Sequence, residues 1–200
     1  MFPLGVVHFP GVALPLRVFE PRYRKLTADC LSGDGQFGVV LIERGREVGG
    51  GDIRFGVGTM TTVVQAGLAA DGTIHLQTIG TRRIRVVEWI ADDPYPRAEV
   101  EDLAPFRLGA TGRDALAAAG RDVRRALAMR AELNEAAMPF NVELDDDPDV
   151  AAFQLAAIAP LGPVDQQRLL EAEEPERFVA LLGELVADEL VVLASRLAGN

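Results

Sequence analysis

The sequence predicts an α+β protein in which a β-barrel subdomain is followed by a helical bundle. In the first hundred of its 200 residues, short apolar runs alternate with turns that contain Gly and Pro, as is typical of strands. From about Leu108 onward, the apolar residues recur with the 3.6-residue period of helices. The change of period falls close to Pro105. We therefore expect a β-barrel subdomain at residues 1–104 and a helical bundle at residues 105–200.

The first half contains a series of apolar runs and one short helix. Pro21 suits the first position of that helix, and the apolar residues from Tyr23 to Leu31 follow helical spacing up to Gly33-Asp34-Gly35. The number of short strands favours a closed or nearly closed barrel, since closure hides strand edges. A break is expected at Gly80, and a hairpin turn at Asp71-Gly72. The expected strands are Val6–Phe9, Ala13–Phe19, Phe37–Glu43, Ile53–Ala66, Thr73–Ile79, Arg82–Ile90 and Arg97–Leu103.

The second half is expected to form four helices. The Asp-rich run before Val150 combines an Asp cap, a proline at the first helical position and negative charge at the positive end of the helix dipole. Asp145, Asp147 and Asp149 also match the start of a calcium loop, but Val150 and Ala156 occupy the positions that require Gly and Glu. No metal site is therefore expected. The expected helices are Arg113–Ala137 with a stop at Pro139, Val150–Ala159, Val164–Ala172 and one that begins at Pro175.

The composition excludes several classes of function. A formal net charge of −10, concentrated in the second half, argues against a general nucleic-acid binder, although an anion site in the first half remains open. Cys30 is the only cysteine, which excludes an internal disulfide and a CxxC motif. With only two histidines, a zinc site would have to be assembled from scattered residues. No apolar stretch is long enough to span a membrane, and we expect a cytoplasmic protein.

The motifs of common enzymes are missing or incomplete. Gly33–Gly38 matches G-x-G-x-x-G, but the expected helix precedes it and a strand follows, the reverse of a dinucleotide site. Neither Ser32 nor Ser195 lies in G-x-S-x-G, and Lys25, the sole lysine, lies on the solvated face of its helix. No Gly-Lys-Ser/Thr sequence occurs, so a P-loop is excluded. We expect no catalytic residue and no cofactor.

Several segments resemble the N-terminal, substrate-binding domain of Lon proteases, which also occurs as a stand-alone bacterial protein. They are Phe2–Gly11, Leu14–Arg24, Phe37–Ile42, Val57–Thr59, Gly80–Arg85 and, near the end, Gln167–Glu171. The resemblance implies a PUA-like pseudo-barrel followed by a helical bundle. It also implies recognition of unfolded or degron-bearing protein segments. Because the ATPase and Ser-Lys peptidase modules of the full-length protease follow this domain, we expect both to be absent here, and no catalytic residue is carried over.

The predicted function is therefore that of a non-catalytic module that binds proteins or peptides, with use as an adaptor for proteolysis or quality control. The expected site is an apolar patch or groove rimmed by arginines, and strand addition at an open barrel edge is a second route. The candidate peptide-binding residues are Phe9, Pro10, Phe19, Tyr23 and Phe37.

The alternative is a PUA-like module that binds RNA or a small anion. Its candidate residues are Arg82, Arg83 and Arg85, the strongest basic cluster in the chain. The competing interpretation of these arginines is a solvated strand whose charges pair with acidic neighbours such as Glu88 or Glu101. A peptidase is the least favoured of the three functions.

Overall fold

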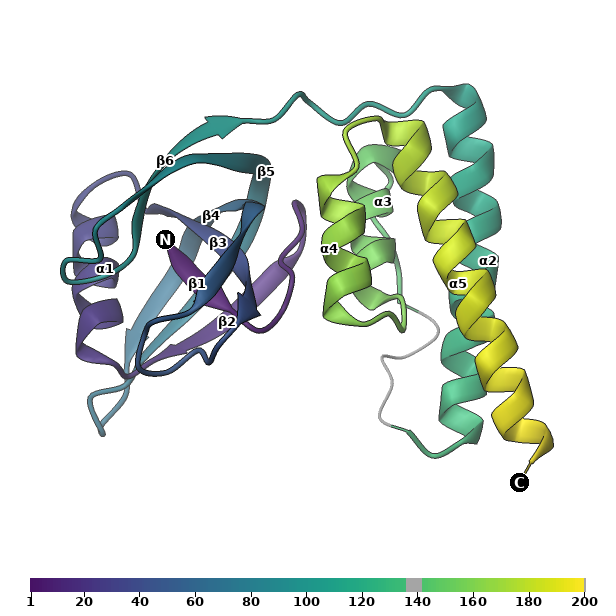
Figure 1. The fold of residues 1–200 in the computed structure, drawn as a ribbon, viewed down its shortest axis with the longest axis horizontal. Coiled ribbons are helices and arrows are strands. Elements are labelled where there is room, and N and C mark those ends of the chain that lie inside the picture. The colour runs from purple at the N-terminus through teal and green to yellow at the C-terminus, as the bar shows by residue number, and fades with distance from the viewer. Residues whose placement is uncertain (136–141, 200) are drawn as a thin grey trace. The chain divides into compact units, whose positions relative to one another are not determined.

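The computed structural model of the protein describes residues 1–135 and 142–199. The chain divides into two compact units, Met1–Ala104 and Pro105–Asn200. Figure 1 shows a curled sheet with one helix in the first unit and helices alone in the second. The expected α+β class is confirmed.

The first unit is built on one six-stranded sheet. Its order is β1-β3-β4-β5-β2, and β6 also pairs with β5. Only the β1–β3 pair is parallel among the pairs formed by the described strands. The elements are β1 (Phe2–Leu4), β2 (Ala13–Val18), α1 (Pro21–Ser32), β3 (Gln36–Arg44), β4 (Ile53–Leu68), β5 (Ile74–Ile90) and β6 (Arg97–Asp102).

The sheet is open, which corrects the expectation of a closed or nearly closed barrel. Its path ends at β1 on one side and at β2 on the other, and these two strands do not pair within the described part of the chain. The physical reason lies in the two strands themselves. β1 has only three residues, and Pro15 within β2 has no N–H to donate to a further ladder. An opening therefore remains between the terminal strands.

The break expected at Gly80 and the strand expected at Val6–Phe9 are both wrong. Gly80 lies inside β5, which runs as one strand from Ile74 to Ile90. The strand near the N-terminus is instead Phe2–Leu4, and the segment after it crosses β5. There Gly11 N–H donates to Gly80 O at 2.9 Å, and Gly80 N–H donates to Val12 O at 3.1 Å. This glycine marks a close approach of two backbones rather than a turn.

The first unit has an apolar core under α1. The buried residues of α1 are Tyr23, Leu26 and Thr27, as the helical spacing predicts. The ring of Tyr23 stacks on that of Phe2, with centroids 4.2 Å apart. The rest of this core comes from four strands and consists of Leu4, Leu16, Val18, Phe37, Val39 and Leu76.

The second unit consists of helices around an apolar core, with α2 and α5 side by side (Figure 1). Three aromatic rings, those of Phe106, Phe153 and Phe178, meet in this core with centroid separations of 4.6 to 5.3 Å. The helices are α2 (Ala110–Glu132), α3 (Pro148–Ile158), α4 (Pro163–Glu171) and α5 (Pro175–Ala198).

The predicted helix boundaries of this unit are largely confirmed. The Asp147 carboxylate accepts the N–H of Asp149 at 2.9 Å, which is the predicted cap of α3. The first helix ends at Glu132, before the end expected at Ala137, because Leu133 caps it and Asn134 has a positive φ of 56°; Pro139 lies outside the described residues. Among the described helices, none combines the length and the apolar character that crossing a bilayer requires.

Candidate functional site

Four of the five candidate peptide-binding residues are buried. The exposed fractions of Phe9, Tyr23 and Phe37 are 0%, 3% and 5%, and Pro10 is also buried. Phe9, Pro10 and Phe37 pack inside the first unit, whereas the buried ring of Tyr23 also lines the floor of a pocket. Phe19 is different, with 57% of its surface exposed.

Phe19 lies at the edge of a pocket of about 160 Å³ in the first unit. The pocket occupies the opening between the two terminal strands, and we call it the β1–β2 pocket. Its lining comes from β1, β2, the start of α1 and the loop between β3 and β4. The lining residues are Phe2, Leu4, Pro15, Leu16, Arg17, Val18, Phe19, Glu20, Tyr23, Glu47 and Val48.

The β1–β2 pocket has an apolar floor and an exposed apolar rim. Phe2, Leu4 and Leu16 belong to the floor and are at most 8% exposed. On the rim, Val48 is 59% exposed, close to the value for Phe19. An apolar cavity of about 150 Å³ is large enough for a benzene ring. The pocket therefore has room for one large apolar side chain.

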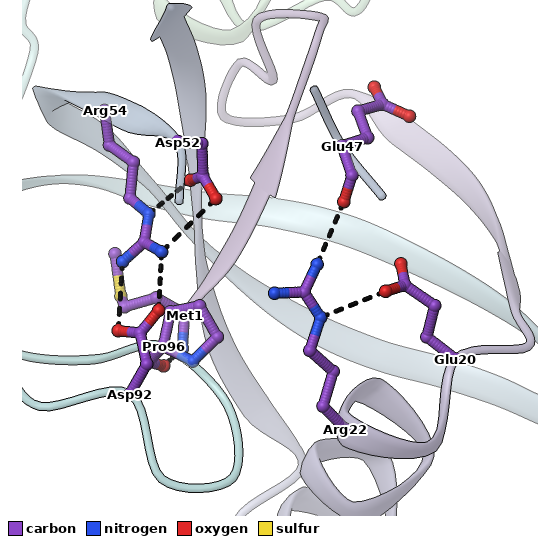
Figure 2. A network of polar contacts seen from close by, with 8 residues as sticks. All are labelled: Met1, Glu20, Arg22, Glu47, Asp52, Arg54, Asp92 and Pro96. Atoms are coloured by element: carbon purple, nitrogen blue, oxygen red, sulfur yellow. Dashed lines mark hydrogen bonds and ion pairs between the residues drawn. The ribbon is translucent and has the colours of Figure 1, made fainter. Parts of the chain in front are cut away.

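Arg22 fixes the loop that carries Glu47 and Val48. Its guanidinium donates to the backbone oxygen of Glu47 at 3.0 Å and to the carboxylate of Glu20 at 3.1 Å (Figure 2). The same guanidinium lies 4.4 Å from the ring centroid of Tyr23, a cation–π contact. The Glu47 carboxylate accepts the N–H of Gly5 at 2.5 Å. The loop is thus tied both to α1 and to the chain beyond β1.

A buried ion-pair network holds the other end of the same loop. Arg54, whose side chain is 9% exposed, donates to the carboxylates of Asp52 and Asp92 (Figure 2). Its guanidinium also lies 4.8 Å from the ring centroid of Trp89. Burial is the largest single effect and would raise the pKa of Asp52. The hydrogen bond from Arg54, a backbone hydrogen bond and the charges of Arg54 and Arg22 together outweigh it and hold that pKa below its usual value. The network positions the loop and shows no feature of a reactive centre.

Two charged groups of the rim are paired, and one is not. Glu20 pairs with Arg22, and Glu47 accepts a backbone N–H as described above. Arg17 is exposed, and its guanidinium has no hydrogen-bond or ion-pair partner within the described residues. Burial raises the pKa of Tyr23 on the floor of the pocket to about 12, although the nearby charge of Arg22 acts in the opposite direction. The rim therefore offers a guanidinium beside an apolar pocket.

The candidate anion-binding residues lie elsewhere, on β5. Arg82 donates to Asp102 at 2.8 Å and to Gln36 at 2.9 Å, and Arg85 pairs with Glu101 at 3.6 Å. Arg83 is buried, with 4% of its surface exposed. The pairs with β6 match the solvated-strand interpretation, and nothing favours the RNA-binding alternative.

The described residues contain no cluster of His, Cys, Asp and Glu that could hold a metal ion. Of the residues that line the β1–β2 pocket, sequence reasoning named only Phe19 and Tyr23 as candidates, and it missed the others, among them Arg17, Glu47 and Val48. Val48 carries the one usable signal, since it is an isolated apolar residue inside a loop of charged residues and glycines. Its proximity to β2 depends on tertiary contacts, which no local pattern reveals.

The chain matches the family model of the ATP-dependent protease La (LON) substrate-binding domain over residues 1–188. It is 27% identical to Lon protease 2 of Herpetosiphon aurantiacus over 197 residues, which are 95% of this chain and 23% of that protein. It is 25% identical to the Lon protease of Cytophaga hutchinsonii over 194 residues, 94% of this chain and 24% of that protein. The chain thus spans about a quarter of the length of these relatives.

Solved structures agree with this match. A Lon N-terminal domain protein from Xanthomonas campestris superposes with a TM-score of 0.65 at 28% identity, covering 90% of this chain and 94% of that one. The N-terminal domain of a Mycobacterium avium complex Lon protease superposes with a TM-score of 0.66, covering 93% and 97%, and at 15% identity it supports the fold alone. The chain therefore belongs to the family of Lon substrate-binding domains.

Proposed function

We propose that this protein is a non-catalytic module that captures exposed, partly apolar segments of other proteins. The observation that carries the proposal is the β1–β2 pocket, an open apolar pocket with an exposed apolar rim, in a chain of the Lon substrate-binding family. The side chains that line it include no serine, cysteine, histidine or lysine of the described chain. Binding is the chemistry that such a lining supports.

The pocket suits brief capture of unfolded chains. Unfolded proteins expose large apolar side chains, and complete burial of one such side chain contributes about 1.5–3 kcal/mol. A dissociation constant of ~100 μM corresponds to about −5.5 kcal/mol, so one buried side chain with a few polar contacts of about 1 kcal/mol each gives weak, reversible binding. Weak binding lets a captured segment pass onward. In the cytoplasm this would suit an adaptor that presents unfolded or degron-bearing segments to a separate protease.

Titration with an unfolded protein tests the proposal. A small protein is reduced and alkylated so that it stays unfolded, labelled with a fluorophore, and mixed with increasing concentrations of this chain while anisotropy is measured. We expect saturable binding with a dissociation constant at or below ~100 μM, near −5.5 kcal/mol. The folded form of the same labelled protein is the control and should not bind. Absence of binding to the unfolded form at ~100 μM would refute the proposed function.

A further inference from the structure

We propose that the β1–β2 pocket binds an extended polypeptide segment in which an acidic residue lies next to a large apolar residue. The apolar side chain enters the pocket, the carboxylate pairs with Arg17, and the segment runs along the outer edge of β2. This proposal rests on the proposed function, because it names the site and the chemistry of the captured segment.

The outer edge of β2 is open to an added strand. Within the described residues β2 pairs only with β5, and Pro15 lies opposite Gln77 in that ladder. A proline within a strand directs its nitrogen away from the neighbouring strand, since it has no N–H to donate. Hydrogen-bonded and non-hydrogen-bonded positions alternate along an antiparallel strand. Arg17, two residues after Pro15, therefore presents its N–H and C=O to the outer edge, where a segment can pair with them.

The pocket lies beside this edge. Leu16 and Val18 of β2 belong to its floor, while Phe19 and Val48 form its exposed rim. Side chains of an extended segment point to alternate faces, so one residue of a segment beside β2 can enter the pocket while its neighbours stay outside. Burial of that side chain also covers the exposed surfaces of Phe19 and Val48. The size of the pocket favours a large apolar residue at this position.

The charges of the rim favour an acidic neighbour. Both rim carboxylates, Glu20 and Glu47, have partners, so Arg17 is the rim charge that lacks one among the described residues. Asp71 also acts on Arg17 electrostatically, but its carboxylate already accepts the N–H of Thr73 at 2.9 Å. A guanidinium binds a carboxylate through two parallel hydrogen bonds. A lysine at the same place in the segment would instead face a like charge.

Three eight-residue peptides with identical flanking residues test the proposal by anisotropy. Their central pairs are Phe-Asp, Phe-Lys and Ala-Asp. We expect the Phe-Asp peptide to bind at least threefold more tightly than Phe-Lys and at least tenfold more tightly than Ala-Asp. Arg17→Glu should reverse the order of the first two peptides. Equal affinities for Phe-Asp and Phe-Lys, or an unchanged order with Arg17→Glu, overturn the proposal.

Surface variants separate this site from the proposed function. Val48→Asp should weaken binding of the Phe-Asp peptide at least fivefold, because it places a charge on the apolar rim. Leu68→Asp and Arg97→Glu are the matched controls, an exposed apolar residue and an exposed arginine that do not line the pocket, and both should bind as the wild type does. Equal binding of unfolded protein to the wild type, Val48→Asp and Arg17→Glu overturns the site and leaves the proposed function intact. No binding of unfolded protein to the wild type overturns both.

Discussion

Gly80 is one of the positions in the first unit where a single added methyl group should cost much stability. A Cβ built there would lie 2.3 Å from the backbone oxygen of Phe9, and 3.0 Å both from the carbonyl carbon of Phe9 and from a methyl group of Thr59. An ordinary contact for a Cβ begins at 3.4 Å, so the Phe9 carbonyl would have to move by more than an ångström. The strain is steric, since Gly80 is not among the residues with positive φ.

The segment around Phe9 cannot move freely. Gly11 and Val12 exchange hydrogen bonds with Gly80, and the Thr59 hydroxyl donates to the backbone oxygen of His8 at 2.5 Å. Overpacking in a core costs about 1–3 kcal/mol, and each main-chain hydrogen bond that breaks adds about 1 kcal/mol. We therefore expect Gly80→Ala to lower the free energy of unfolding of the first unit by about 3–5 kcal/mol. That is a large part of the ~5–15 kcal/mol typical of a folded domain.

Urea unfolding followed by tryptophan fluorescence measures this loss. Trp89 is the only tryptophan of the chain and lies in β5, so its fluorescence reports on the first unit. With a urea m-value of about 2 kcal/mol/M, the midpoint should fall by about 2 M. Gly56→Ala is the matched control, because Gly56 also lies in a strand but a Cβ there meets no atom within 4 Å. A midpoint for Gly80→Ala within ~0.3 M of the wild type would refute the steric reasoning.

Two further predictions concern buried polar groups of the first unit, and Trp89 fluorescence measures both. Burial lowers the pKa of His8 from 6.5 to about 4, so the first unit should lose about 3 kcal/mol as the pH falls from 6.5 to 4. His8→Gln should lack this part of the pH dependence. If the free energy of unfolding of His8→Gln and of the wild type changed with pH in parallel, the pH dependence could not be attributed to His8. Arg54→Met should cost about 3–5 kcal/mol, because it leaves the Asp52 carboxylate, 1% exposed, without its cation. Asp92→Asn should cost about 1 kcal/mol or less, since Asp92 is 40% exposed, and equal losses for the two variants would exclude a buried network.

The sequence predicts most elements of this fold because their signals are local. Pro21 and the apolar spacing after it define α1, and the Asp-rich run before Val150 defines the start of α3. β1 gives no such signal, because it has three residues and pairs in parallel with β3, some 37 residues further along the chain. Glycine is typical of turns, so the sequence suggests a turn at Gly80. Only the close contact with the backbone of Phe9 shows why glycine is required there.

The candidate site is less predictable, because contacts between distant segments of the chain form it. Aromatic residues near the N-terminus indicate either a core or a binding surface, and the local sequence does not distinguish the two. Phe9 and Phe37 belong to the core, whereas Phe19, one residue beyond β2, points to solvent. The β1–β2 pocket brings together segments that are up to about 45 residues apart, Phe2–Leu4 and Glu47–Val48 among them. Such a site becomes visible only when the sheet is folded and left open.

In the segment Leu14–Arg24, which resembles the Lon family, some residues belong to the core and others to the rim of the pocket. In β2 and α1, Leu16, Val18 and Tyr23 are buried, while Arg17 and Phe19 alternate with them on the surface. Because residues i and i+2 of a strand share a face, the buried positions can hold the fold while the exposed ones change. Substitutions at Arg17 and Phe19 should therefore alter which segments bind, with little change in the free energy of unfolding. Under the proposed function, the opening of the sheet provides the pocket, and the rim residues determine what enters it.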